Sequence, residues 1–302
     1  MRSRETYLAF AAILLLALIW GYNWVVMKVA LQNSAPLLFA ALRVVLSAPV
    51  LLLYLLLQKR SLALPSLGYI VPYGLLQSTG FVGATLLALE YAGAGKTAIL
   101  VYMMPIWLML LAWPVLGERL HGLQIPALVL ALLGLVIILE PWRAGSSPWQ
   151  GPFFALISGM SWAASAIWHK RFVPKGQDLI NATFWQASIG GTVLLITALV
   201  FEGWQVRWTG PFIAALAYNA IPGTALAYVL WLFALRHLPS GVAGIATLFA
   251  PLIGVFAAWL QLGERPNIWE AIGMAGIFSA LFLVSWQHLR PKDDNITMSA
   301  QE

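Results

Sequence analysis

The sequence predicts an all-α integral membrane protein with ten transmembrane helices, arranged as two inverted five-helix repeats. Three observations lead to this fold class. Of the 302 residues, 61% are hydrophobic and only 9% are charged, whereas a soluble domain carries roughly 25% charged residues. The hydrophobic residues gather in ten long runs, and one motif occurs twice, 146 residues apart. Since so few charges cannot cover a water-soluble surface, the chain is expected to lie in a lipid bilayer.

Each run is long enough for one membrane crossing, which takes about 20 apolar residues as a helix. The runs cover 7–31, 36–57, 67–91, 96–116, 123–140, 150–169, 180–201, 210–235, 240–262 and 268–288. They lack the alternation of a transmembrane β-strand. The first run follows Arg2 and Arg4 and has no small-residue cleavage site, so we interpret it as an uncleaved span and not as a signal peptide.

The repeated motif places a proline inside an apolar run and a Leu-Gly-Glu-Arg sequence at its end. Pro105 precedes Glu118 in the first copy, and Pro251 precedes Glu264 in the second. Because an internal repeat determines the architecture, we predict a first five-helix repeat over 1–145 and a second, inverted repeat over 146–290. Residues 291–302 would form a polar cytoplasmic tail.

The distribution of basic residues predicts the orientation in the membrane. With a cytoplasmic N-terminus, the inner loops would hold eleven Lys and Arg residues and the outer loops four. Cytoplasmic loops carry the excess of positive charge, so both termini are expected inside. Five spans in each half, an odd number, would invert the halves relative to each other. Inverted repeats are typical of secondary transporters, whose substrate site lies near the bilayer midplane.

The first span reads Ile19-Trp20-Gly21-Tyr22-Asn23-Trp24-Val25-Val26-Met27-Lys28. Together with Arg43 and the doubled Leu-Gly-Glu-Arg motif, it resembles the drug/metabolite transporter superfamily, specifically its ten-helix exporters with two EamA-type halves. The similarity covers about residues 7–288. Because Trp and Tyr are abundant, the chain most resembles the YddG-like amino-acid exporters within this superfamily. The resemblance implies an inner (plasma) membrane secondary transporter that exports small amphipathic metabolites by alternating access. Amino acids, aromatic and bulky neutral ones first, would be its substrates.

Candidate substrate-binding residues are aromatic or neutral polar side chains at helical spacing within the spans. A site for an uncharged organic solute needs apolar and aromatic walls with a few aimed polar groups. Trp20, Asn23 and Trp24 meet this need on one face of the first span, since they are three and four residues apart. The alternative is that such residues only pack helices together. The full candidate set is Trp20, Asn23, Trp24, Tyr73, Gln77, Phe81, Tyr102, Trp162, Ser165, Tyr228 and Trp231.

Four residues are candidate hinges. Pro105 and Pro251 lie inside spans at the same repeat position, where proline removes a backbone hydrogen bond and bends a helix. Pro222 and Gly223 lie inside the eighth span. Static kinks are the alternative, because proline is common in transmembrane helices.

Lys28 and Arg43 are the basic residues within predicted spans, where charge is costly and often functional. Lys28, near its span end, is expected to reach the headgroup region. Arg43 would either meet a substrate carboxylate or serve a structural role such as capping a helix. Glu118 and Glu264 would either form gating ion pairs or satisfy helix ends.

The missing features narrow the function further. The chain has no cysteine, its four histidines lack a second ligand at metal spacing, and no glycine-rich phosphate loop is present. No enzyme activity, catalytic residue, cofactor, metal site or nucleic-acid partner is therefore predicted. No carboxylate lies in the middle of a span, which favours uncoupled facilitated diffusion. The alternatives are an exporter of drugs or other metabolites, including a proton-coupled one, and, from other classes, an intramembrane enzyme or a sensor. The expected partners are a small-molecule substrate and the lipid bilayer, and a monomer is sufficient.

Overall fold

The computed structural model describes residues 4–118, 120, 122–140, 142, 149–238 and 248–287, and these residues are almost entirely helical. The side chains of a few residues in this part, Tyr228 among them, are outside the description. Within the described residues, the α-helices without an adjoining π-helical segment are α1 (Arg4–Ala30), α2 (Pro36–Leu57), α5 (Ala94–Val101), α6 (Met104–Leu116), α7 (Gln124–Leu139), α8 (Gln150–Phe172), α9 (Leu179–Phe201), α13 (Phe249–Leu262) and α14 (Ile268–Gln287). The third predicted span begins with α3 (Leu67–Gly74). The remaining segments are η1 (Leu75–Val82), α4 (Gly83–Tyr91), α10 (Gly210–Ala220), η2 (Ile221–Leu226) and α11 (Ala227–His237).

The predicted hydrophobic runs correspond to these helices or to consecutive helical segments. Among the described residues, six helical stretches are long and apolar enough to cross a membrane: Tyr7–Ala30, Pro36–Leu57, Leu67–Tyr91, Ala94–Leu116, Leu179–Phe201 and Ile268–Gln287. Gln124–Leu139 and Phe249–Leu262 are shorter apolar helices. The all-helical membrane fold is confirmed, whereas the count of ten spans stays a prediction. Residues 239–247, which begin the predicted ninth span, and the predicted tail 291–302 are outside the described residues.

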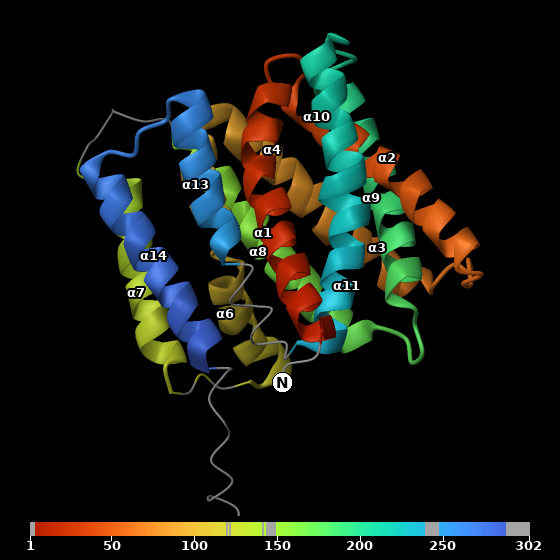
Figure 1. Ribbon diagram of the computed structural model, residues 1–302, viewed down its shortest axis with the longest axis horizontal. Helices are drawn as coiled ribbons and strands as arrows, with labels where there is room; N and C mark the ends of the chain where they lie inside the picture. Colours follow the sequence, from red (N-terminus) through yellow and green to blue (C-terminus); the bar gives the residue numbers. More distant parts are fainter. Residues whose placement is uncertain are drawn as a thin grey trace, which may run out of the picture.

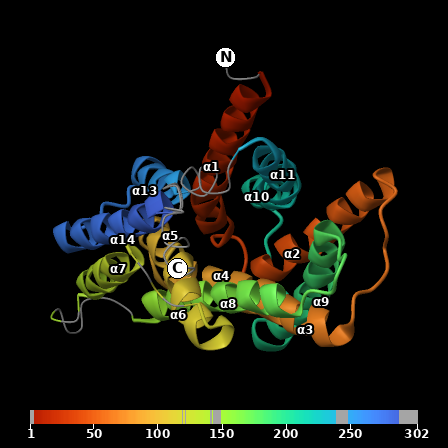
Figure 2. The same ribbon diagram turned by 90° about the horizontal axis from the view of Figure 1, so that it is seen from below.

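Helices from the two ends of the chain lie beside one another (Figures 1 and 2). The first helix, α1, packs against α13, α11 and α10, while α8 packs against α4, α6 and η1. Two further pairs are α2 with α9 and α7 with α14. At Gly21 of α1, a Cβ atom would lie 2.7 Å from the carbonyl oxygen of Ala250 in α13, so only glycine permits this approach.

Within the described residues, two of the spans contain π-helical segments, a geometry that the sequence did not predict. The segments η1 and η2 begin at Leu75 and Ile221, which are 146 residues apart and therefore occupy the same repeat position. Around η1, backbone carbonyls are satisfied by hydroxyls of α8: Ser161 donates to the oxygen of Leu76 (2.8 Å) and Ser158 to that of Phe81 (3.0 Å). π-Helical turns occur frequently at functional sites.

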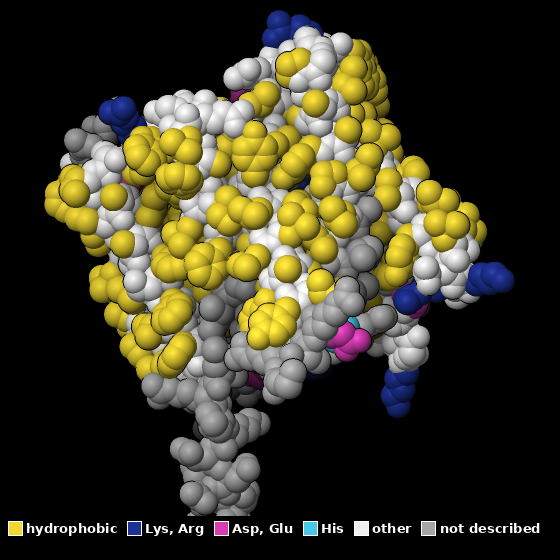
Figure 3. Space-filling model, in the orientation of Figure 1, with side chains coloured by type: hydrophobic (Ala, Val, Ile, Leu, Met, Phe, Trp, Pro, Cys, Tyr) yellow, Lys and Arg dark blue, Asp and Glu magenta, His cyan; other side chains and the backbone are white. Residues whose placement is uncertain are grey.

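The surface carries a broad hydrophobic belt. In Figure 3, hydrophobic side chains cover most of the visible face, and the Lys and Arg side chains gather at its edges. Many large apolar side chains of the described residues are exposed, including Leu53 (56%), Val200 (71%) and Phe201 (79%). A contiguous apolar surface of this kind is suited to lipid tails and not to water.

We call the side at which α1 begins the N-terminal face and the side at which it ends the distal face. The N-terminal face also carries the ends of α8 and α11 and the start of α9 (Figure 1). The distal face carries the starts of α2, α5 and α14 and the end of α13.

Candidate substrate-binding site

The polar and aromatic face predicted on α1 lies inside the protein. Asn23 and Trp24 are 6% and 5% exposed, Met27 is buried, and Trp20 is half-buried. The carbonyl oxygen Oδ1 of Asn23 is buried and accepts no hydrogen bond. This face therefore combines aromatic walls with an unused polar group, which is the composition expected of a binding site.

Trp20 contacts two other candidates, both from the eighth predicted span. Its indole nitrogen donates to the carbonyl oxygen of Gly223 (3.3 Å), and its ring centroid lies 6.4 Å from that of Trp231 in α11. The carbonyl of Gly223 belongs to η2, where the π-helical geometry leaves it available to a side chain. The structure thus brings together candidate residues from the first and the second predicted half of the chain.

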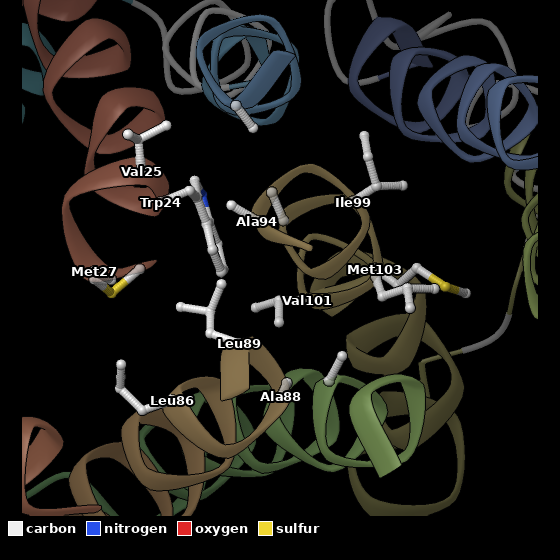
Figure 4. Packing of buried hydrophobic residues seen from close by; sticks show 14 of the residues in the cluster. Trp24, Val25, Met27, Leu86, Ala88, Leu89, Ala94, Ile99, Val101 and Met103 are labelled. Atoms are coloured by element: carbon white, nitrogen blue, oxygen red, sulfur yellow. The ribbon is translucent and has the colours of Figure 1, made fainter. Parts of the chain in front are cut away.

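Trp24 points from α1 toward the helices of the third and fourth predicted spans. Figure 4 shows its ring between Leu89 of α4 and Ala94 of α5, and its centroid lies 6.2 Å from that of Tyr102. Tyr102 occupies the break between α5 and α6, and Pro105 follows in the first turn of α6. The predicted break in this span is therefore present beside an aromatic pair. Pro251 similarly lies in the first turn of α13.

Gln77 and Ser165 also meet. The hydroxyl of Ser165 is within hydrogen-bond distance of the side-chain oxygen of Gln77 and of the backbone oxygen of Trp162, so η1 and α8 are joined by candidate residues. The carbonyl of Phe81 accepts from Thr85 (2.7 Å) and from Ser158. These polar groups already have partners inside the protein.

Tyr73 belongs to a different group. Its ring centroid lies 5.8 Å from that of Tyr69 and 5.1 Å from that of His169, near the N-terminal face. The hydroxyl of Tyr69 is 2.7 Å from Nδ1 of His169. The side chain of Tyr228 is outside the described residues. The candidates therefore form separate contact groups, and a single cavity lined by all of them stays a prediction.

The two basic residues within spans behave differently from each other. The ammonium of Lys28 donates to the carbonyl oxygens of Leu89 and Ala92 (3.1 Å for Ala92), so it caps the end of α4. The guanidinium of Arg43 donates through Nη1 to the sulfur of Met27. Arg43 thus caps no helix among the described residues, and neither a carboxylate nor a carbonyl accepts from it there.

The helix-end interpretation of Glu264 is confirmed. Its carboxylate accepts from the backbone N–H groups of Ala94 (2.9 Å) and Gly95 (3.1 Å), which begin α5. Nearby, Lys96 and Glu270 form a largely buried ion pair of 2.9 Å. Together with Arg265 these groups line a pocket of about 240 Å³ on the distal face. On the N-terminal face, the counterpart Glu118 pairs with Lys170 in an exposed position.

Two carboxylates outside the spans join α2 to α9. Glu202, after α9, accepts from the backbone N–H groups of Leu37 (3.0 Å) and Leu38 (2.9 Å), and burial raises its pKa more than these bonds lower it. Asp178, before α9, pairs with Arg60 at 2.8 Å. Burial alone would raise the pKa of Asp178, but two backbone N–H groups and Arg60 together lower it.

Within the described ranges, no group of three or more His, Asp or Glu residues could hold a metal ion. In the part of the chain that the structure describes, buried aromatic and amide side chains, an apolar surface and carboxylates at helix ends are typical of a helical membrane transporter. A model of the EamA-like transporter family matches residues 8–140 and 149–286. The chain belongs to the EamA-like transporter family, with two EamA-type halves.

Similar proteins extend over nearly the whole chain. "Uncharacterized transporter YoaV" of Bacillus subtilis is 30% identical over 93% of this chain and 97% of its own length. "Probable amino-acid metabolite efflux pump" of Escherichia coli is 26% identical over 91% and 95%. A crystal structure covering 95% of this chain and 98% of its own shows the same fold, with a TM-score of 0.64 and 20% identity. The family and these names point to a transporter and not to an enzyme.

Proposed function

We propose that this protein exports amino acids, aromatic and bulky neutral ones in particular, across the inner (plasma) membrane. The observation that carries the proposal is the interior face of α1, where Trp20 and Trp24 meet aromatic partners beside the unused oxygen of Asn23. Aromatic walls suit an apolar side chain, and an unpaired amide oxygen suits a polar head. The E. coli relative named as an amino-acid metabolite efflux pump supports the same substrate class.

The proposed mechanism is alternating access without a coupling ion. The described carboxylates that have partners, such as Glu202 and Glu264, are bound at helix ends. No Asp or Glu occupies the middle of a predicted span, where a proton carrier is usually placed. The substrate would then move down its own gradient and leave the cell when it accumulates.

Conformational change would occur within the fourth, eighth and ninth predicted spans. Candidate hinges are the break before Pro105, the start of α13 at Pro251, and η2 with Pro222 and Gly223. Breaks at equivalent repeat positions would let each half bend in the same manner. If the two inverted halves exchanged their conformations, a site open to the outside would become open to the inside.

An exporter of drugs or other metabolites, including a proton-coupled one, is the second candidate. The aromatic pairs would accept flat organic cations as well, through cation–π contacts. The aromatic lining alone does not separate these substrate classes, so transport has to be measured with both.

Purified protein in liposomes would test the proposal. We expect uptake of aromatic and bulky neutral amino acids without an imposed pH or sodium gradient, unchanged by a proton ionophore. Liposomes without protein supply the background. Uptake that strictly requires a proton gradient would refute the uncoupled mechanism, and uptake of cationic drugs without amino acids would refute the substrate assignment.

A further inference from the structure

Polar side chains of α1, α2 and α10, namely Asn23, Arg43 and Asn219, have donors and acceptors without suitable partners. Arg43 of α2 is half-buried and, among the described residues, its guanidinium donates only to the thioether of Met27. A thioether is a weak acceptor, and a guanidinium offers five N–H donors. A cation held inside a membrane protein is normally paired with an anion or with carbonyl groups.

Two asparagines on the neighbouring helices α1 and α10 each have an unused acceptor. Asn23 of α1 is 6% exposed and Asn219 of α10 is 0% exposed, and the Oδ1 atoms of both are buried without a hydrogen bond. The amide nitrogen of Asn219 donates to the backbone oxygen of Ala215 (2.9 Å), which fixes the orientation of this amide. Buried polar atoms are nearly always paired in folded proteins, so two orphaned oxygens in one region indicate a missing partner.

Contacts of nearby side chains indicate that the three residues lie at one helix interface. Phe39 of α2 and Phe212 of α10 have ring centroids 5.8 Å apart. Arg43 and Asn219 follow these rings by four and seven residues, on the same helix faces. The two helices therefore bring Arg43 and Asn219 to the same interface.

The third helix joins at the same depth. The hydroxyl of Tyr218 donates to the backbone oxygen of Ile19 (2.8 Å), one turn before Asn23 on α1, and Arg43 itself reaches Met27 one turn after it. At 1.5 Å per residue, Asn23, Arg43 and Asn219 all lie about 10 to 14 Å from the distal ends of their helices.

We propose that Arg43, Asn23 and Asn219 bind the charged head of a zwitterionic α-amino acid. The guanidinium would take the carboxylate through two parallel hydrogen bonds, for which its planar fork is suited. The two asparagine oxygens would accept from the ammonium, which carries three donors. This inference rests on the proposed function and adds which atoms recognise the substrate.

The combination of groups excludes simpler occupants. A chloride ion would satisfy Arg43 but has no donor for either asparagine oxygen. An amine without a carboxylate would satisfy the oxygens and leave the guanidinium unpaired. A ligand with both charges completes the whole cluster, and the side chain would then lie against the aromatic residues of α1. The site would therefore demand both head-group charges and tolerate different apolar side chains.

Binding of three ligands with one common ring tests this directly: L-phenylalanine, phenethylamine without the carboxylate, and 3-phenylpropionate without the ammonium. Binding to the full-length protein in detergent can be measured by calorimetry. We expect L-phenylalanine to bind about 30-fold or more tightly than either analogue, which corresponds to roughly 2 kcal/mol. The variant Arg43→Gln should bind L-phenylalanine as weakly as phenethylamine, with phenethylamine unaffected. Arg60→Gln, which removes a basic residue at the N-terminal face, is the matched control and should change none of the three affinities.

A second variant decides the question if Arg43→Gln fails to fold. Asn219→Asp places a carboxylate beside Arg43 that competes with the substrate carboxylate. We expect a higher unfolding temperature without ligand, weaker binding of L-phenylalanine, and binding of phenethylamine that is unchanged or tighter. An unchanged preference between the two ligands would overturn the inference.

The outcomes also separate this inference from the proposed function. If amino acids are transported and neither variant alters the preference for both charges, only the inference fails. If the wild-type protein neither binds nor transports any amino acid, the proposed function fails and the inference with it.

Discussion

At the scale of single residues, Glu264 and Lys28 hold the short connection between α4 and α5. Glu264 of α13 binds the first N–H groups of α5, and Lys28 of α1 binds the last carbonyls of α4. Helix ends leave such groups without intrahelical partners, and the opposite charges match the helix dipole. Two side chains far apart in the sequence therefore stabilise one link on the distal face.

Replacing Glu264 tests the size of this contribution. Because Glu264→Ala leaves two N–H groups of α5 without their acceptor, we expect a loss of about 1–2 kcal/mol in the free energy of unfolding. Tryptophan fluorescence during thermal unfolding in detergent would measure it. Glu90→Ala is the control, since Glu90 is an exposed carboxylate near the same face. Equal stability of both variants would contradict the capping role.

Residue roles could be predicted from the sequence only in part. The helix-end role of Glu264 follows from the Gly-Glu-Arg pattern, but its target, α5 in the other half of the chain, depends on packing. Lys28 was expected to reach the headgroups, and the structure shows a cap on α4 instead. Asn219 could be noted as a polar residue of the eighth predicted span, but its unused oxygen becomes evident only when its neighbours are known.

At the scale of helices, α3 and α9 approach unusually closely. A Cβ atom at Gly190 would lie 2.1 Å from the backbone oxygen of Gly74. Since backbone atoms meet there, no side-chain rotation can make room. Thr79 adds a hydrogen bond across the same interface, from its hydroxyl to the oxygen of Gly190 (2.8 Å).

A methyl group at Gly190 should therefore force the two helices apart. We expect Gly190→Ala to destabilise the protein by about 1–3 kcal/mol, as overpacking generally does. Gly68→Ala in α3 is the matched control, because no atom lies within 4 Å of the added Cβ there. Thermal unfolding of both variants gives the comparison, and a stability of Gly190→Ala equal to that of Gly68→Ala would rule out the close contact.

The break between α5 and α6 leads to a prediction about transport. We expect Pro105→Ala to slow turnover at least several-fold while changing substrate affinity little, because bending belongs to the conformational step. Exchange of labelled substrate across liposomes gives turnover, and equilibrium binding gives affinity. Pro114→Ala, also in α6 but away from the break, should leave both unchanged. A selective loss of affinity in Pro105→Ala would show that the proline shapes the site and is not a hinge.

Helix boundaries and the break before Pro105 were largely predictable, whereas the π-helical segment η1 was not. The runs 36–57 and 67–91 agree with Pro36–Leu57 and Leu67–Tyr91 because apolar composition is a strong signal over that length. The π-helical geometry of η1 could not be predicted from the sequence, because Leu75–Val82 contains neither proline nor an unusual residue pattern. Its carbonyls depend on hydroxyls of α8, which only the tertiary structure brings near.

At the scale of the whole molecule, the orientation in the membrane is open to a direct test. Reporter fusions at the C-terminus, at Arg143 and at Gln177 should report cytoplasmic, external and cytoplasmic positions. The basis is the excess of Lys and Arg in the predicted inner loops. Arg143 is outside the described residues, whereas Gln177 lies next to Asp178 at the start of α9. An external C-terminus would contradict the predicted orientation.

The two π-helical segments also restrict how the length of the chain can change during evolution. Every residue turns an α-helix by about 100°, so losing one residue from Leu75–Val82 would rotate the rest of that span. Thr85, whose hydroxyl lies 2.6 Å from that of Ser158, would then face elsewhere. Substitutions keep this register and deletions destroy it, which the yields of folded deletion and alanine variants would measure. Each half is therefore expected to keep the length of its own π-helical segment. The starts of η1 and η2, 146 residues apart, are consistent with this.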